Sequence, residues 1–204
     1  MFDLVAHLDK SLSGAICFPS TKVFCFKPFP DDFYPTVLQN LPPNEFYTDL
    51  PHEDALREDG SSTRTVMDLN APYAPTFWKD LHVVLCSTGV QELFREYMGF
   101  EGSVHAVARL FRDFSGYKIN PHPDSSKKAC TVQFYLPSDN SQVELGTSFY
   151  DQNGGTFDEI IKIPFLPNTG YAFKVTENSY HGANLPKFTK PRDTLILTYY
   201  KDKI

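Results

Sequence analysis

His122, Pro123 and Asp124 place a histidine and a carboxylate two residues apart, and a further histidine, His181, follows later in the chain. Side chains at alternate positions of an extended strand point to the same face, so we expect His122 and Asp124 to point together. A histidine from a later strand would complete a set of two imidazoles and one carboxylate. Such a set binds a divalent metal, typically non-haem Fe(II), and leaves coordination positions open for chemistry.

Arg192 follows the second histidine and opens a predicted strand. A guanidinium group can hold a carboxylate through two parallel hydrogen bonds. A metal beside such a clamp indicates an oxygenase that consumes a 2-oxo acid. Taken singly, His122 and His181 are also compatible with ordinary histidines of a β-sandwich, and Arg192 with a surface arginine; their joint order on strands favours the metal site.

Two other His-x-Asp triplets occur in the chain, His7-Leu8-Asp9 and His52-Glu53-Asp54. The first lies in an N-terminal segment that we expect on the solvated surface. The second lies in the charged stretch from Asp49 to Gly60, for which a flexible lid and a simple exposed connection both remain open. We predict that neither triplet binds metal, because neither is flanked by strands.

The candidate ligands, by contrast, lie between segments rich in β-branched and aromatic residues, which are typical of strands. The predicted strands are 104–114, 129–137, 171–175 and 192–200. Gly182 is expected to mark a bend after His181. On the last strand, Arg192, Thr194, Ile196 and Thr198 share a face suited to a ligand pocket, and the opposite face suits packing against another layer.

Residues 104–200 resemble the Fe(II)- and 2-oxoglutarate-dependent oxygenases of the prolyl-hydroxylase-like branch. The matching segments are His122-Pro123-Asp124, Phe134-Tyr135-Leu136, Gly146–Tyr150, His181 and Arg192. The spacing from Asp124 to His181 and from His181 to Arg192 fits that family. The distal histidine lacks a Pro-Gly-Ser-His motif, which argues against the phytanoyl-type branch, and the first hundred residues show no recognisable likeness.

The resemblance implies a mainly β fold with supporting helices, built as a double-stranded β-helix, the jelly-roll or cupin-like barrel. At this length, residues 1–204 are expected to form a single oxygenase domain. Within it, residues 1–100 would supply supporting strands and helices, and residues 101–204 would form the metal-bearing barrel core.

The resemblance also implies roles for individual residues. The implied Fe(II) ligands, and hence catalytic residues, are His122, Asp124 and His181. The expected contacts to 2-oxoglutarate are Arg192 and Tyr135 at its distal carboxylate, with Thr131, Gln133 and Thr194 nearby. Thr131 and Gln133 are included because they share a strand face with Tyr135.

The implied activity is a dioxygenase reaction that hydroxylates an unactivated C–H bond of a protein side chain or small molecule and releases succinate and CO2. Its cofactors would be Fe(II), 2-oxoglutarate and dioxygen, with ascorbate as a supporting reductant. A carboxylate ligand at Asp124 favours hydroxylation, because halogenating relatives lack it; desaturation and ring closure remain open. The alternative is a cupin-like metal- or sugar-binding module without oxidation, which would not need Arg192.

The composition bears on the partners, the cellular location and the cysteine state of the protein. The net charge is −6 and no basic block is present, which gives no support to a nucleic-acid or membrane role. The segment Met1–His7 lacks the pattern of a signal peptide, so we expect a cytoplasmic protein. The cysteines Cys17, Cys25, Cys86 and Cys130 are scattered, which is unlike a closed zinc site and favours a reduced state. The oligomeric state is left open.

The first hundred residues are expected to brace the barrel. Short strands are predicted over 15–18, 22–26 and 64–69, and a helix from Asp31-Asp32 through Leu41. An apolar stripe from Thr76 to Tyr97 predicts one long helix, or two shorter ones because Gly89 weakens its middle.

Overall fold

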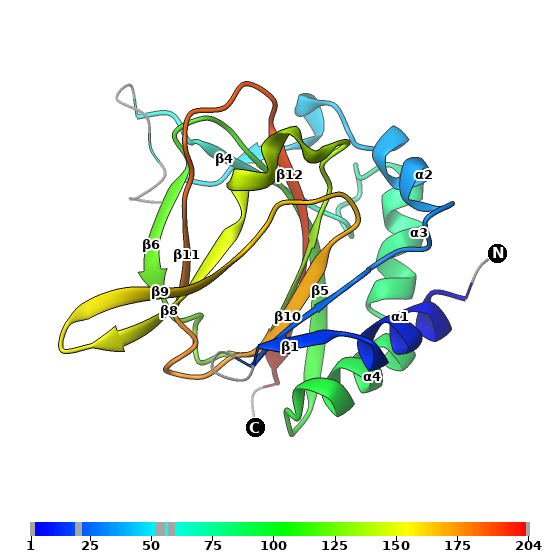
Figure 1. Cartoon of the computed structure of the whole chain (residues 1–204). Helices are drawn as coiled ribbons and strands as arrows, with labels where there is room; N and C mark the ends of the chain where they lie inside the picture. Colours follow the sequence, from blue (N-terminus) through cyan, green and yellow to red (C-terminus); the bar gives the residue numbers. More distant parts are fainter. Residues whose placement is uncertain (1–2, 19–21, 52–55, 57–59, 203–204) are drawn as a thin grey trace.

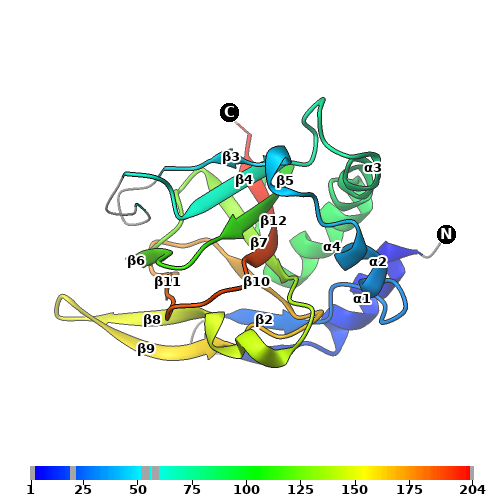
Figure 2. The same ribbon diagram turned by 90° about the horizontal axis from the view of Figure 1, so that it is seen from above.

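Two antiparallel sheets face one another in a jelly roll (Figures 1 and 2), which confirms the predicted fold class. The computed structural model describes residues 3–18, 22–51, 56 and 60–202. The larger sheet has the order β1 (Ile16–Phe18), β2 (Val23–Phe26), β10 (Gly170–Lys174), β7 (Lys128–Tyr135), β12 (Arg192–Lys201), β5 (Val104–Asp113), β4 (Arg64–Asp68) and β3 (Thr48–Asp49). The smaller sheet has the order β6 (Lys118–His122), β11 (His181–Asn184), β8 (Thr147–Asn153) and β9 (Thr156–Ile163).

Helices cover the outer face of the larger sheet, on the side away from the smaller one (Figure 2). They are α1 (Leu4–Ser13), α2 (Tyr34–Gln39), α3 (Thr76–Leu85) and α4 (Thr88–Met98). The chain also forms the short 3-10 helices η1 (Asn44–Phe46) and η3 (Asn140–Leu145), and Leu145 of η3 belongs to the second core, between the two sheets. Within the described part of the chain, no helix combines the length and the apolar character that crossing a bilayer requires.

The alternation of strand β12 separates two cores. Leu195, Leu197 and Tyr199 are fully buried in the cluster that joins the larger sheet to the helices, as predicted for that face. Phe94 of α4 contacts Tyr199, with ring centroids 5.9 Å apart. Burial of each such side chain stabilises the fold by roughly 1.5–3 kcal/mol. The opposite face of β12 points into the space between the two sheets, where the second core and the pocket lie.

In the first hundred residues one local expectation needs revision, one of two alternatives is confirmed, and one helix was not predicted. Helix α2 begins at Tyr34, after Asp31-Asp32, and ends at Gln39. The stripe from Thr76 onward forms two helices, the second of the two alternatives. The break lies at Ser87, whose side chain accepts a hydrogen bond from the Val90 amide and caps α4. Helix α1 was not predicted, although its buried Leu4, Leu8 and Leu12 recur at helical spacing.

Gly182 lies inside strand β11, so the predicted bend after His181 is wrong. A Cβ atom at this position would lie 2.8 Å from the Ile119 carbonyl oxygen of β6. Glycine therefore allows β11 to approach β6 closely, and in this pairing His181 stands directly opposite His122. The glycine serves the geometry of the site and does not turn the chain.

All four cysteines are free in the structure. Cys130 is buried in β7 and Cys86 follows the last turn of α3. Cys17 and Cys25 lie on the paired strands β1 and β2, where their register partners are Phe24 and Ile16 and not each other.

Candidate metal and cosubstrate site

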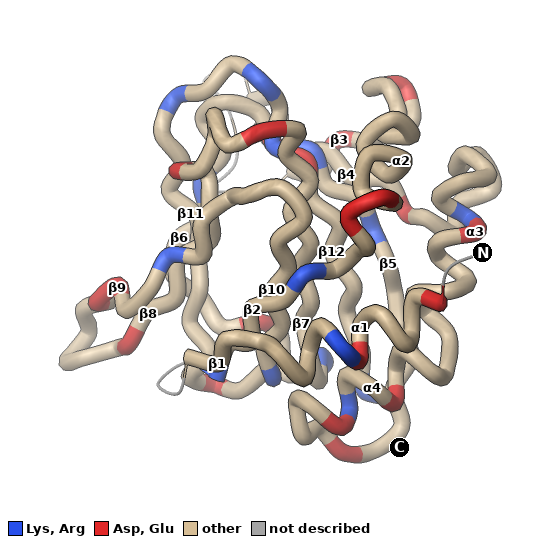
Figure 3. The backbone as a smooth tube through the Cα atoms, turned by 45° about the vertical axis from the view of Figure 1, so that its right-hand side comes forward, with Lys and Arg blue, Asp and Glu red and all other residues tan. Residues whose placement is uncertain are grey.

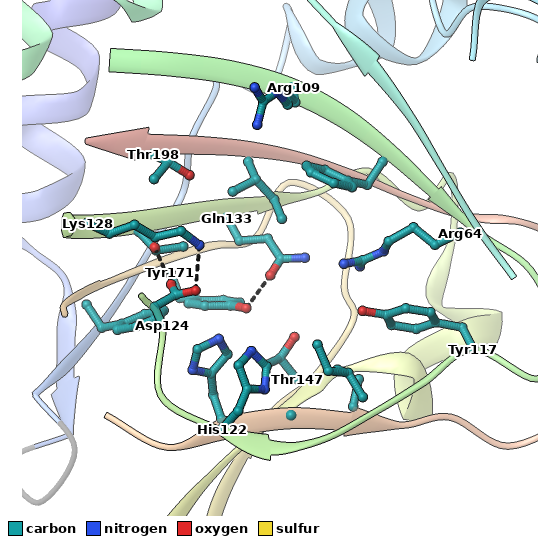
Figure 4. A pocket seen from close by; sticks show the side chains of 18 of the residues that line it. Arg64, Arg109, Tyr117, His122, Asp124, Lys128, Gln133, Thr147, Tyr171 and Thr198 are labelled. Carbon is teal, nitrogen blue, oxygen red and sulfur yellow. Dashed lines mark hydrogen bonds and ion pairs between the residues drawn. The ribbon is translucent and has the colours of Figure 1, made fainter. Parts of the chain in front are cut away.

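Three predicted ligands meet at the open end of the pair β6–β11. His122 ends β6, Asp124 follows two residues later, and His181 begins β11. One ligand atom from each residue can be chosen so that all three lie within 4.8 Å of one another. Among the described residues, this is the only group of three or more histidines, cysteines and carboxylates placed to hold a metal. Figure 4 shows His122 and Asp124 on neighbouring walls of the pocket.

Backbone carbonyls set the orientation of both imidazole rings. Nδ1 of His122 lies 2.8 Å from the Asn120 carbonyl oxygen, and Nδ1 of His181 lies 3.0 Å from that of Ser179. In each ring Nδ1–H donates to the carbonyl, which leaves the Nε2 lone pair for a metal. Metal-bound histidines in proteins are usually held in this way through the other ring nitrogen.

The Asp124 carboxylate is held by two side chains of strand β7. Lys128 Nζ lies 2.5 Å from Oδ1 and forms an ion pair, and Thr131 Oγ1 donates to Oδ2 at 2.6 Å. Both bonds are drawn in Figure 4. Thr131, predicted to contact 2-oxoglutarate, therefore orients a candidate metal ligand here. Lys128, four residues after Asp124, is a second partner of that carboxylate.

The charge states of the site favour cation binding. Burial, with a smaller effect from the neighbouring His122, lowers the pKa of His181 to about 4 despite the opposing effect of Asp124. Burial alone would raise the pKa of Asp124, but His181, Lys128 and the Thr131 hydrogen bond outweigh it and hold that pKa below its usual value. At neutral pH the site therefore offers a neutral His181 imidazole and an ionised Asp124 carboxylate, the protonation states that metal ligation requires.

Lys128 and a divalent metal would compete for the same carboxylate. Lys128→Met removes the ammonium charge and keeps an unbranched side chain, so we expect the affinity for Mn(II) to rise roughly tenfold. Isothermal titration calorimetry of the two proteins measures this. Lys127→Met, a change at the exposed neighbouring lysine, is the control and should bind Mn(II) like the wild type. Weaker binding by Lys128→Met would instead mean that the ion pair orients Asp124 for the metal.

A pocket of about 240 Å³ opens between the two sheets above these ligands. Its walls come from β4, β5, β7, β10 and β12 on one side and from β6, β8 and β11 on the other. The polar and charged residues of its lining are Arg64, Arg109, Tyr117, His122, Asp124, Lys128, Thr131, Gln133, Thr147, Tyr171, His181, Arg192, Thr198 and Tyr200. The pocket thus contains all three candidate metal ligands and several cations.

Arg192 and Tyr135, the residues predicted at the distal carboxylate, are both buried. Arg192 lines the pocket, and its side chain is 1% exposed and ion-paired to Asp113. The Tyr135 hydroxyl accepts a hydrogen bond from the Thr147 amide at 2.8 Å and donates to the Ile163 carbonyl at 3.3 Å. Tyr135 is absent from the pocket lining, so its ring, over which Arg192 stacks at 5.4 Å, serves as packing for that arginine.

Gln133 and Thr194 were both expected near 2-oxoglutarate, but only Gln133 is part of the pocket lining. Gln133 lines the pocket and accepts a hydrogen bond from the Tyr171 hydroxyl. Thr194 is fully buried beside Arg192 on β12, and its hydroxyl has no hydrogen-bond partner within the described part of the structure. A buried hydroxyl without a partner is costly, so a ligand or a water at this position would stabilise it.

Sequence reasoning missed Arg64 and Asp113. Arg64 begins β4 and stands opposite Asp113 of β5, which it contacts through two hydrogen bonds of 2.6 and 3.1 Å. Burial would lower the pKa of Arg64, but Asp113 outweighs it and raises that pKa above the ordinary value. Arg64 lies in the half of the chain expected only to support the barrel. An arginine at a strand end is a weak signal by itself, and its partner is 49 residues away.

The other His-x-Asp triplets do not form comparable sites where they are described. His7 lies on α1 with Nε2 near the Lys27 carbonyl oxygen, and Asp9 accepts a hydrogen bond from Tyr97. The triplet His52-Glu53-Asp54 and most of the segment considered as a lid lie outside the described residues. Over the rest of the chain, acidic and basic residues are interspersed (Figure 3).

Known proteins resemble this chain in fold and not in overall sequence. No protein-family model matches the sequence, and no curated protein matches it. Among solved structures, a prolyl hydroxylase from Trichoplax adhaerens, in complex with a peptide fragment of the hypoxia inducible factor oxygen degradation domain, is similar with a TM-score of 0.65 at 15% identity. That match covers 97% of this chain and 90% of that one.

Two bacterial structures are similar over nearly the whole chain. A prolyl-4-hydroxylase from Pseudomonas putida has a TM-score of 0.62 at 11% identity and covers 98% of both chains. An oxidoreductase of the 2OG-Fe(II) oxygenase family from Burkholderia pseudomallei has a TM-score of 0.61 at 12% identity, covering 98% of this chain and 92% of that one. The chain therefore has the fold of the 2-oxoglutarate and Fe(II) oxygenases, including its first hundred residues.

Proposed function

We propose that this protein is an Fe(II)- and 2-oxoglutarate-dependent dioxygenase that hydroxylates an unactivated C–H bond of a protein side chain or small molecule. One observation carries the proposal: His122, Asp124 and His181 converge in the same pocket as a cluster of cationic side chains, within a fold shared with such oxygenases. Two imidazoles and one carboxylate are the ligand set of non-haem Fe(II) oxygenases and leave positions for further ligands.

The residues fit both groups that this chemistry requires. The Nε2 atoms of His122 and His181 and the Asp124 carboxylate would hold Fe(II). At another part of the pocket, Arg64 and Arg192 share the single carboxylate of Asp113, which leaves one net positive charge. A 2-oxo acid with a second carboxylate would bring a negative charge to it. Such compensation favours binding, because an unbalanced buried charge is costly.

Fe(II) held by His122, Asp124 and His181 would supply the oxidative decarboxylation of 2-oxoglutarate by dioxygen, with one oxygen atom going to succinate, CO2 released, and the second oxygen atom inserted into the substrate C–H bond. The protein's own contribution is orientation and exclusion of water. Its backbone carbonyls hold both imidazoles, Thr131 and Lys128 hold the carboxylate ligand, and the aromatic rings of Phe173 and Tyr171 line the wall around the ligands.

The proposal predicts conversion of 2-oxoglutarate to succinate by the purified protein in air with Fe(II), and ascorbate to keep the iron reduced. Uncoupled turnover is expected without the prime substrate, because the candidate metal ligands and the cationic side chains already line one pocket. Succinate is measured by mass spectrometry, with heat-denatured protein as the background. Adding candidate proteins or small-molecule extracts should raise the rate and add one oxygen atom to the true substrate.

Metal binding without any succinate would contradict the proposal. That result would be expected of a cupin-like module that binds a metal or a sugar without oxidation.

A further inference from the structure

Strands β8 and β9 form a hairpin whose outer part extends away from the barrel. The register between the two strands shifts after Phe149, so that Ile160 is an extra residue in β9, and such a bulge bends the strand. Residues 150–159, beyond the bulge, form the arm, and Figures 1 and 2 show it projecting beyond the rest of the molecule. The side chains of β9 are exposed along the whole arm, so a partner can reach them.

Strand β9 has a free edge. It pairs with β8 on one side, and no other strand in the described part of the chain pairs with it. Because backbone groups alternate in direction along a strand, about half of its N–H and C=O groups point away from β8. An edge of this kind can accept a strand from another polypeptide through backbone hydrogen bonds.

The usual protections of an edge strand are weak in β9. Edge strands of monomeric proteins are commonly short, covered, or interrupted by lysine or proline. In residues 147–163 the only basic residue is Lys162, which lies at the barrel end, outside the arm, and proline is absent. Phe157 and Ile160 are large apolar residues that remain 38% and 36% exposed. The edge is therefore open to pairing, with apolar side chains available for contact.

The arm carries an unbalanced negative charge. Asp151 and Asp158 stand directly opposite each other in the pairing of β8 with β9, and Glu159 follows. Asp158 accepts a hydrogen bond from Asn153 at 2.9 Å, but none of the three carboxylates forms an ion pair with a residue that the structure describes. Like charges at opposed positions of two strands are destabilising. Figure 3 shows acidic residues on both strands of the arm. Lysine or arginine side chains of a partner would relieve this repulsion.

The arm is attached to the residue that precedes a candidate metal ligand. The Tyr180 ring lies 5.1 Å from that of Phe157. The Tyr180 hydroxyl donates a hydrogen bond to Gln152 at 3.0 Å, and its carbonyl accepts one from the Tyr150 amide at 3.0 Å. His181 is the next residue in the chain, so these contacts fix the arm relative to the candidate ligands.

The barrel end of β9 lies in one row of the smaller sheet with both histidines. Ile161 stands opposite Phe149, which stands opposite His181. His181 in turn stands opposite His122. With about 4.8 Å between neighbouring strands, a strand added to β9 would lie roughly 15 Å from β11. An extended chain covers that distance in about five residues.

Building on the proposed function, we infer that the prime substrate is a polypeptide, and that an extended segment of it rich in lysine and arginine pairs with β9 as a further strand of the smaller sheet. The free edge supplies hydrogen bonds to the backbone of the segment, and the carboxylates of the arm select its basic side chains. The oxidised side chain lies elsewhere on the same polypeptide, about five or more residues from the docked segment.

Fluorescence anisotropy tests the docking step with the whole protein and without turnover. The probe is a labelled peptide of alternating lysine and valine, about as long as the 8 residues of β9. The wild type should bind it saturably. An analogue of the same charge, N-methylated at every backbone amide, should bind more weakly by about tenfold or more, because it cannot donate hydrogen bonds to the edge. Equal binding of the two peptides would show that charge alone accounts for the binding and would overturn the inference.

A double variant tests the carboxylates of the arm. Asp158→Asn combined with Glu159→Gln should weaken probe binding by about tenfold, and both side chains are exposed, so the fold should be retained. The matched control is Asp80→Asn combined with Glu96→Gln, which changes the net charge equally on helices α3 and α4, at the outer face of the larger sheet. The control should bind like the wild type. Equal weakening in both double variants would contradict a site on the arm.

The substrate assignment is tested with a peptide library. The lysine–valine segment is joined to a randomised segment by a glycine–serine linker of about two or about eight residues. With Fe(II), 2-oxoglutarate and air, mass spectrometry should find one added oxygen atom in the randomised segment behind the longer linker. This addition should be at least ~10-fold more frequent than behind the shorter linker or without the lysine–valine segment.

Equal oxidation in the three libraries would overturn the inference and leave the proposed function standing. The same holds if no library is oxidised while the protein still forms succinate from 2-oxoglutarate. A protein that forms no succinate would refute the proposed function, and the substrate assignment with it. Probe binding needs neither metal nor turnover, so it distinguishes that failure from a failure of the arm to dock a basic segment.

Discussion

His122→Ala should reduce the proposed 2-oxoglutarate turnover by at least ~100-fold, because loss of one of the three candidate metal ligands should cost more than the loss of a residue that merely orients a ligand. His122 is the appropriate choice among the ligands, since His181 packs against Phe173 and Phe149 and its removal would also disturb the core. Succinate production under saturating Fe(II) measures the effect, and circular dichroism confirms that the fold is retained.

The control for this variant is His7→Ala, which alters the histidine of a second His-x-Asp triplet. His7 lies on α1, far from the site in sequence, and contacts a backbone carbonyl. Its removal should leave turnover at the wild-type rate. Comparable losses in His7→Ala and His122→Ala would show that the effect of His122→Ala does not report on metal ligation.

Asp113→Asn destabilises the protein by roughly 3–5 kcal/mol, the usual cost of removing one partner from a buried ion pair. Asparagine has nearly the same shape, so the change removes the charge that Arg64 and Arg192 share and opens little empty space. The free energy of unfolding in urea measures the effect. Asp139→Asn, in an exposed ion pair with Lys190, is the matched control and should have a much smaller effect.

A loss of less than about 1 kcal/mol in Asp113→Asn would mean that solvent or nearby dipoles already compensate the two arginines. The net positive charge that we assign to this part of the pocket would then be absent. The argument for a carboxylate-bearing cosubstrate would lose its electrostatic basis, although the metal ligands would be unaffected.

The strands of the larger sheet could be predicted because their local pattern matches their burial. Leu195, Leu197 and Tyr199 alternate with polar residues, and the structure places these three against the helices. The strands of the smaller sheet have no such pattern. Strand β9 is mostly exposed, and β11 consists of His181, Gly182, Ala183 and Asn184, a sequence with little tendency to form a strand. It becomes one because β6 and β8 pair with it on both sides.

In the site, too, the placement of some residues could be predicted from the sequence and that of others could not. The proximity of His122, Asp124 and His181 could be anticipated, because their spacing on strands resembles a known family. The placement of Arg64 depends on the register between β4 and β5, and that register is set by packing across the whole sheet. The predicted role of Thr131 was incomplete for a similar reason, since its hydroxyl reaches Asp124 only when β7 follows the turn at Ser125.

Anaerobic titration of the Fe(II)-loaded protein with 2-oxoglutarate tests the central claim most directly. Chelation of the metal by the 2-oxo acid should produce a charge-transfer absorption band that saturates at one 2-oxoglutarate per protein and is absent from His122→Ala. If the wild-type protein binds Fe(II) and 2-oxoglutarate but gives no such band, the two do not meet at one site, and the assignment of this pocket to dioxygenase chemistry is wrong.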